Sequence, residues 1–163
     1  MLSRTADTET FLAGFSSSPC GARSRRLCRR ILRPFRRDAT ELADLVVTGI
    51  KRATASLARD YGDGREPMPK PGDFVMMLDG KGRSRFSWRT TGITIKPLSE
   101  VDEAFAWDEG EGDRTRDWWL DAHHRYFGRQ ASREGFDFDV LTVFERFEIV
   151  WPLTGSPTNA SAN

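Results

Sequence analysis

Apolar residues recur at helical spacing near residue 45. Leu42, Leu45 and Val46 share one helix face, which predicts an amphipathic helix over residues 41–48 with Thr40 as its N-cap. Gly49 follows at the position where glycine commonly ends a helix. The pattern therefore predicts a short helix that stops at a glycine, so that the residues after it begin a new segment.

A longer helical pattern occupies residues 116–127, with Thr115 as its cap. Its apolar stripe consists of Trp119, Leu120, His123 and Phe127. A shorter helix is predicted before it, from Ser99 as N-cap, with Asp102 at its third position, to about Trp107. In this setting His123 is interpreted first as a core residue, because it shares its stripe with aromatic side chains.

Strand patterns occupy residues 74–78, about 85–96 and 139–151, and Asp79-Gly80-Lys81-Gly82 predicts a hairpin between the first two. Residues 53–57 are small and neutral and begin a strand or a turn. Residues 57–70 contain strong breakers and form a loop, either a lid or an ordinary connector. The order of helix, strands, helices and strand predicts an α+β fold, with a mostly antiparallel sheet that favours a small barrel.

Glu145 breaks the pattern of the last strand. It falls on the same face as Phe147, Ile149 and Trp151, where an apolar residue is expected. A carboxylate there requires a bulge, a buried ion pair with an arginine, or a barrel end open to water.

Charge is distributed unevenly along the 163 residues, although the formal net charge is only +1. Residues 1–40 hold nine arginines against three acidic residues, a local charge of +6, and the remaining 16 basic and 21 acidic residues give −5. Binding of nucleic acid would therefore depend on a local patch and not on overall charge. No apolar run is long enough to span a membrane, and residues 1–20 lack the apolar core of a secretory signal, so we expect a cytoplasmic protein.

The two ends of the chain differ from its middle. Residues 1–38 form an Arg-rich N-terminal extension, which is either an arm for RNA or a membrane surface, or a solvated segment. Residues 153–163 are polar and are expected to form a disordered tail. These patterns leave one domain over residues 39–152.

Candidate chemistry begins directly after the first helix. Lys51, Arg52, Thr54 and Ser56 place two cations and two hydroxyls within six residues. Such a group suits a phosphate or a polarised carbonyl. The alternative is a solvated basic loop whose hydroxyls make local turn contacts.

A second candidate is the acidic segment 108–113, which holds four carboxylates in six residues. Glu109 or Glu111, with its pKa raised by its neighbours, could act as a general base that activates water, or the group could hold a divalent cation. The alternative is a solvated loop whose charges favour the start of the next helix. Lys51 is the natural partner for these carboxylates because its charge is opposite.

Several segments in this order resemble the ASCH domain family. The first is Gly49-Ile50-Lys51-Arg52-Ala53-Thr54, which matches a Gly-x-Lys-x-x-Thr signature. The others are Pro71-Gly72-Asp73, Glu109 to Thr115, Trp118 to His123, and Glu145-Arg146-Phe147. The resemblance covers roughly residues 39–152 and implies a PUA-like β-barrel flanked by helices.

The resemblance also implies a site. In ASCH members similar to amidohydrolases that act on acetylated cytidine, a Lys, a Thr and a Glu form the catalytic set. Lys51 and Thr54 match the first two, and Glu109 matches the third, with Glu111 as the alternative in register. We expect the residues that bind substrate to be Arg52, Ser56, Asp113 and His123.

This sequence departs from the family pattern in two places. Arg89 and Gly92 stand where members often carry acidic residues, so no acidic role transfers there. The Arg-rich lead-in replaces a less basic segment, and the similar amidohydrolases are shorter chains, which suggests a different branch.

The functional expectation is an ASCH-domain protein that binds RNA or a modified nucleoside in a Lys/Thr/Glu pocket. As an enzyme it would be a hydrolase, either a ribonuclease or a nucleoside amidohydrolase. The alternative is a non-catalytic RNA-binding module associated with translation. No organic cofactor and no membrane partner are expected, a divalent cation is an open option, and the oligomeric state is not predicted.

Overall fold

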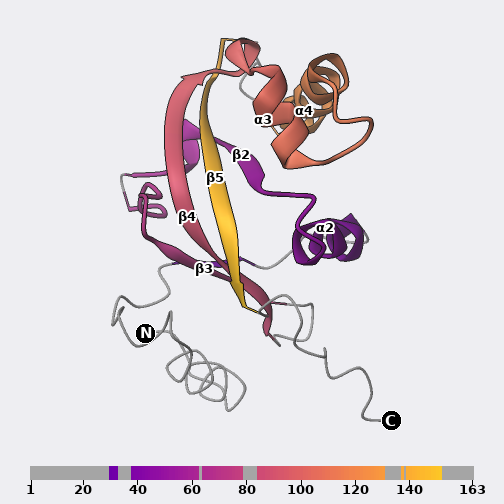
Figure 1. The fold of residues 1–163 in the computed structure, drawn as a ribbon. Coiled ribbons are helices and arrows are strands. Elements are labelled where there is room, and N and C mark those ends of the chain that lie inside the picture. The colour runs from indigo at the N-terminus through magenta and orange to yellow at the C-terminus, as the bar shows by residue number, and fades with distance from the viewer. Residues whose placement is uncertain are drawn as a thin grey trace.

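The computed structural model describes residues 30–32, 38–62, 64–78, 84–130, 137 and 139–151. Within them a curled sheet contains five strands in the order β1-β3-β4-β5-β2. The strands are β1 (Arg30–Leu32), β2 (Ala53–Leu57), β3 (Phe74–Leu78), β4 (Ser84–Pro97) and β5 (Leu141–Trp151). All neighbours are antiparallel except β1 and β3. This sheet is a half-barrel with helices around it, which confirms the predicted α+β class (Figure 1).

The two longest strands of the sheet, β4 and β5, lie side by side (Figure 1). They pair from Ser87↔Trp151 to Pro97↔Leu141, and the register shifts twice along β4, between Ser87 and Trp88 and between Thr90 and Gly92. Such bulges bend a strand and increase its twist. The sheet therefore curls, and residues of β2 and β5 face a concave side.

Helices cover the sheet at two places, each over its own core. Helix α2 (Asp38–Val47) packs over a cluster that includes Val75, Trp88 and Phe147. Helices α3 (Glu103–Glu109) and α4 (Arg116–Gln130) pack over another cluster, in which the Phe105 and Phe144 rings meet edge to face at 4.8 Å. Strand β2 lies between β5 and these helices, at the edge of the sheet (Figure 1).

Several predicted boundaries shift. Helix α2 begins at Asp38, so Thr40 lies inside it and is not its N-cap. Ser99 lies in a 3-10 turn (Leu98–Glu100) and donates a hydrogen bond to Asp139, while the side chain of Asp102 accepts from Phe105 N and caps α3. The prediction for α3 was wrong because two capping residues stand close together and the second one starts the helix.

Other boundaries differ by a few residues. Helix α4 extends to Gln130 and β5 begins at Leu141. The predicted loop 57–70 contains a 3-10 turn, Ala58–Asp60. Strand β1 joins the sheet from within the Arg-rich segment, whereas the rest of residues 1–38 before Asp38 and the tail 153–163 lie outside the described residues.

Glu145 lies on the concave side and is 1% exposed. Its Oε1 accepts hydrogen bonds from Thr90 Oγ1 at 2.6 Å and from Trp88 Nε1 at 3.3 Å. Both donors lie next to the register shifts of β4, so the bulged strand brings them to the carboxylate. Of the three arrangements that could accommodate this acid, the described residues show register shifts of the neighbouring strand beside its two hydrogen-bond donors.

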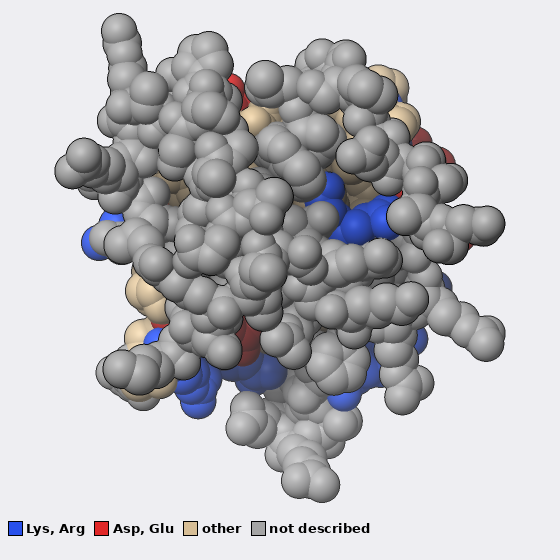
Figure 2. Space-filling model, turned by 90° about the horizontal axis from the view of Figure 1, so that it is seen from below, with Lys and Arg blue, Asp and Glu red and all other residues tan. Residues whose placement is uncertain are grey.

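Charged side chains of the described residues are visible at some places on the face seen from below (Figure 2). Lys and Arg appear there at several separate places, with acidic side chains between some of them. No helix of the described residues is both long and apolar enough to cross a bilayer.

Candidate functional site

The connection between α2 and β2 positions Lys51. Gly49 has φ +75°, the left-handed conformation that ends α2, and the next two amide groups both donate to Leu45 O. Arg52 N then donates to Asp108 O at 2.6 Å, which ties the connection to the end of α3. As a result the Lys51 side chain is directed inward and is only 7% exposed.

Two carboxylates meet the Lys51 ammonium. Its Nζ lies 2.6 Å from Oε1 of Glu111 and 3.3 Å from Oε1 of Glu109. Glu109 is 2% exposed and ends α3, and Glu111 stands in the loop after that helix. The predicted partnership between Lys51 and the acidic segment is thus present as a buried ion pair with a half-buried second acid.

Glu109 also links the helices to the edge of β2. Its Oε1 accepts from Ala55 N at 3.2 Å, and its Oε2 lies 3.5 Å from Nε2 of His123 on α4. Burial opposes ionisation and would raise the pKa of Glu109, but the nearby Lys51 and His123 outweigh it. The net effect is a pKa below the ordinary glutamate value, so the raised pKa expected for a general base is wrong for Glu109, which is an anion at neutral pH.

This lowered pKa predicts how stability depends on pH. Because folded Glu109 holds its proton less tightly than unfolded Glu109, its contribution is complete above about pH 5 and is lost as the pH falls from the ordinary glutamate pKa to the lower pKa of folded Glu109. Urea unfolding measured between about pH 7 and pH 3 should show this loss, and Glu109→Gln should remove that part of the slope. The control Glu100→Gln, at an exposed position, should retain it.

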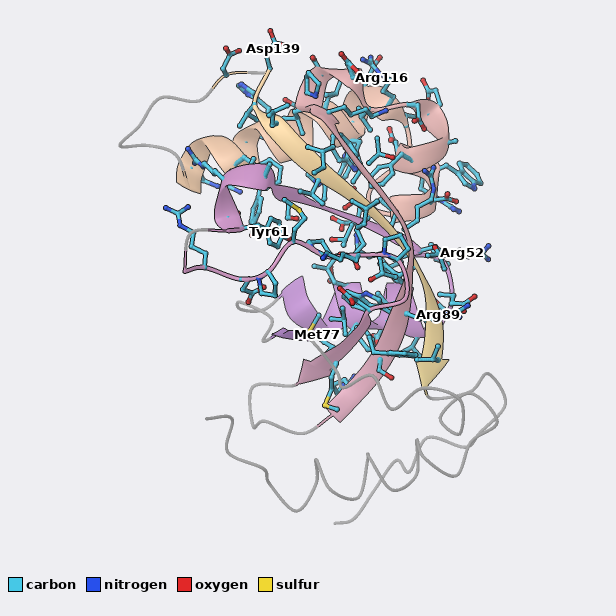
Figure 3. All side chains as sticks on the ribbon, turned by 90° about the vertical axis from the view of Figure 1, so that its left-hand side faces the viewer. Arg52, Tyr61, Met77, Arg89, Arg116 and Asp139 are labelled. Carbon is cyan, nitrogen blue, oxygen red and sulfur yellow. The ribbon has the colours of Figure 1, made fainter. Side chains whose placement is uncertain are left out.

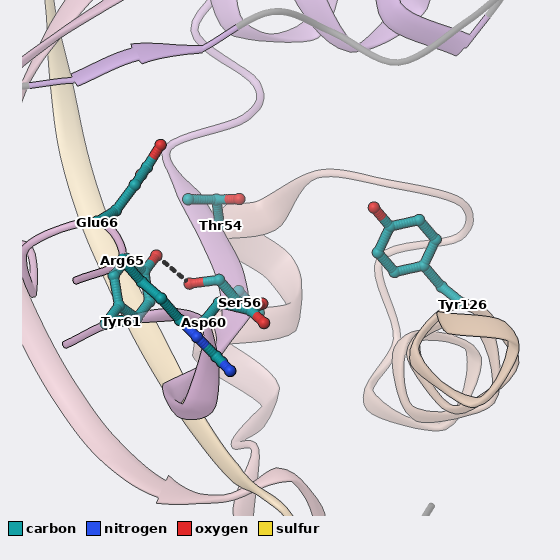
Figure 4. A pocket seen from close by; sticks show the side chains of 8 residues that line it. Thr54, Ser56, Asp60, Tyr61, Arg65, Glu66 and Tyr126 are labelled. Carbon is teal, nitrogen blue, oxygen red and sulfur yellow. Dashed lines mark hydrogen bonds between the residues drawn. The ribbon is translucent and has the colours of Figure 1, made fainter. Parts of the chain in front are cut away.

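A cleft of about 770 Å³ opens beside β2. It is lined by residues from β2, from the following turn and loop, and from α4: Thr54, Ala55, Ser56, Asp60, Tyr61, Arg65, Glu66 and Tyr126. The hydroxyls of Ser56 and Tyr61 lie 2.6 Å apart, and Tyr126 stands on the opposite side of the cleft (Figure 4). The volume falls within the range of small-molecule sites.

The buried pair adjoins this cleft through β2. Ala55 lines the cleft, and its amide group donates to Glu109. On α4, His123 contacts Glu109 and Tyr126 lines the cleft, and residues three apart on a helix are neighbours on its surface. Thr54 and Ser56 therefore line a cleft that is linked to Glu109 through the amide of Ala55, whereas Lys51, Glu109 and His123 do not line it themselves.

The other predicted substrate-binding residues point elsewhere. Arg52 is exposed and donates from Nε to Gly49 O at 2.7 Å, and in Figure 3 it lies on the opposite side of the view from Tyr61. Asp113 accepts from the amide and hydroxyl groups of Thr115, which lowers its pKa, and Thr115 Oγ1 in turn caps α4 by accepting from Trp118 N. Neither Arg52 nor Asp113 lines the cleft.

The cleft walls include residues that sequence reasoning did not select. Tyr61 and Tyr126 are the chain's two tyrosines, and both line the cavity together with Arg65. Tyr126 is 51% exposed. The available signal was its place three residues after His123, since residues with that spacing are neighbours on a helix surface.

The arrangement of the described side chains gives little support for a metal site. No group of three His, Cys, Asp or Glu side chains there is arranged to hold an ion. Glu109 and Glu111 both have Lys51 as partner.

Comparison with known proteins gives a consistent result. The family model of the ASCH domain matches residues 31–151. No protein with a curated description matches the chain.

Two crystal structures are similar in fold and sequence. One is an ASCH domain from Lactobacillus crispatus JV V101, with 28% identity and a TM-score of 0.75, covering 91% of this chain and 97% of the other. The second is protein EF3133 from Enterococcus faecalis V583, with 31% identity and a TM-score of 0.71, covering 88% and 92%. With the family match over most of its length, this chain belongs to the ASCH domain family.

Proposed function

We propose that this protein binds a modified nucleoside, free or within RNA, in the cleft beside β2 and hydrolyses an acyl amide on its base. The observation that carries the proposal is that Thr54 lines a nucleoside-sized cavity, and that its neighbour Ala55, which also lines it, donates its amide to Glu109 of the buried Lys51–Glu109 pair. Tyr61 and Tyr126 offer aromatic surface to a planar base, and Ser56 offers a polar group. Binding and chemistry would then share one side of β2.

In the proposed reaction the Thr54 hydroxyl oxygen attacks the acyl carbon. Its proton passes through the Lys51–glutamate pair to the departing amine nitrogen, and the carbon–nitrogen bond breaks. Water then adds to the Thr54 ester, which releases the acid and restores the hydroxyl. The positive charge of Lys51 would also stabilise the negative oxygen that forms during each addition.

Replacing Thr54 with Val tests this role with little change in shape. We expect Thr54→Val to reduce release of cytidine from N4-acetylcytidine by about 100-fold or more, because the nucleophile is lost. The measurement is turnover of the purified protein, followed by separation of cytidine from substrate. Thr94→Val is the matched control, since this threonine of β4 does not line the cleft, and it should retain full turnover.

One further substrate and one binding measurement define the outcome. Short single-stranded RNA, with and without Mn²⁺, tests hydrolysis of a phosphodiester in place of the amide. Absence of any product, together with RNA binding that weakens in Tyr126→Ala, would replace the enzyme proposal with the non-catalytic RNA-binding module. Equal turnover of wild type and Thr54→Val would remove Thr54 from the mechanism.

A further inference from the structure

The ring of His123 lies between two acceptors. Its Nδ1 is 3.0 Å from the carbonyl oxygen of Trp119, one turn earlier in α4, and its Nε2 is 3.5 Å from Oε2 of Glu109. A carbonyl oxygen only accepts, so the hydrogen bond to Trp119 requires a proton on Nδ1. Whether Nε2 also carries a proton then decides whether His123 can donate a hydrogen bond to Glu109.

The two carboxylate oxygens of Glu109 differ in their hydrogen-bond partners. Oε1 accepts from Ala55 N and contacts Lys51, whereas Oε2 is buried and has no hydrogen-bond partner among the described residues. An Nε2 without a proton would turn its lone pair toward this oxygen and leave two buried acceptors unsatisfied. A proton on Nε2 gives both atoms a partner.

Charge balance favours the same proton. The charged groups that face one another here come from the α2–β2 connection, the end of α3, the loop after it and α4: Lys51, Glu109, Glu111 and His123. With His123 protonated, two positive and two negative charges cancel. Without this proton the cluster carries an excess negative charge, although the side chains of Lys51, Glu109 and His123 are only 8%, 2% and 12% exposed.

We propose that His123 is a positioning residue, whose imidazolium donates from Nε2 to Oε2 of Glu109 and holds that carboxylate against Lys51. The ring of His123 stacks on Trp119 at 3.7 Å, which fixes its orientation for this hydrogen bond. The predicted effect on turnover rests on the proposed function, whereas the hydrogen bond itself does not. His123 is thus assigned to the support of Glu109 and not to direct contact with substrate.

Nitrogen NMR of the ¹⁵N-histidine-labelled full chain tests the proton directly. At pH 7 we expect both ring nitrogens of His123 to show the shifts of protonated nitrogen, and Glu109→Gln should abolish the Nε2 proton because the carboxylate is gone. His124→Gln assigns the two histidines and should leave the His123 signals unchanged. An unprotonated Nε2 in wild-type protein at pH 7 would overturn the proposal.

Two substitutions separate hydrogen bonding from packing. His123→Gln keeps an N–H donor for Glu109 but loses the ring, and His123→Phe keeps a ring on Trp119 but loses the donor. We expect Phe to lower kcat about 100-fold with little change in KM, as for a displaced catalytic group, and Gln to retain most activity.

The opposite order, with Phe active and Gln inactive, would show that the ring acts only through packing. If the protein has no turnover at all, the proposed function fails, but the NMR result still decides the proposal about His123. A protonated Nε2 in an inactive protein would keep the Glu109 hydrogen bond as a structural feature of the protein.

Discussion

Lys51→Met is expected to lower the free energy of unfolding by about 3–5 kcal/mol and to abolish any turnover, because it leaves a buried carboxylate without its cation. Glu109 is 2% exposed and would keep only Ala55 N and His123 as neighbours. Methionine preserves most of the aliphatic volume of lysine, so the loss reports the charge and not a cavity. Urea unfolding at pH 7 measures the change.

Lys70→Met is the matched control, since Lys70 is exposed and the same chemical change there should cost less than about 0.5 kcal/mol. The double variant Lys51→Met/Glu109→Gln should recover part of the lost stability, because neither partner then remains as an unpaired buried charge. Equal stabilities of Lys51→Met and Lys70→Met would show that the pair contributes nothing to folding.

The partnership of Lys51 with the acidic segment was predictable because it depends on local signals. A helix that ends at Gly49 leaves Lys51 outside the helix and able to meet another segment, and segment 108–113 holds four carboxylates in six residues. Strand β3 matches its predicted range for a similar reason, because alternation and the turn before it lie in adjacent residues. The opposite charges and the glycine that ends the helix were together sufficient to predict that Lys51, Glu109 and Glu111 form one site.

The cleft was not predictable because its walls come from separate parts of the chain. Tyr61 belongs to the segment after β2 and Tyr126 to the outer half of α4, and only the packing of α4 against β2 brings them together. His123 shows the same limit. Its place in an apolar stripe correctly indicated packing on Trp119, but the contact with Glu109 depends on how α3 ends.

Glu145 illustrates a third case, in which the sequence showed a conflict without its solution. An acid on an apolar face required compensation, and the compensation lies in the register of a different strand. Register shifts in β4 depend on the pairing of two long strands, and a single-strand pattern does not contain that information. Such conflicts are still useful, because they indicate where tertiary structure must provide a partner.

The loop that carries Glu111 gives the second large expected effect. Gly112 has φ +56°, and a Cβ added there would overlap the indole ring of Trp118 on α4. Gly112→Ala therefore combines a left-handed backbone cost of about 1–2 kcal/mol with an overpacking cost of about 1–3 kcal/mol. We expect a clear loss of stability in urea unfolding, together with weaker contact between Glu111 and Lys51.

Gly64→Ala isolates the steric part of this effect. Gly64 has φ +82°, also left-handed, but a Cβ added there meets no atom within 4 Å, so it should show the backbone cost alone. The difference between the two variants, about 1–3 kcal/mol, then measures how firmly Trp118 holds the loop. Equal losses would mean that Trp118 moves aside freely and that Lys51 alone keeps Glu111 in place. A larger loss in Gly112→Ala would show that the start of α4 fixes the second acid of the site, so that the site is held from two elements at once.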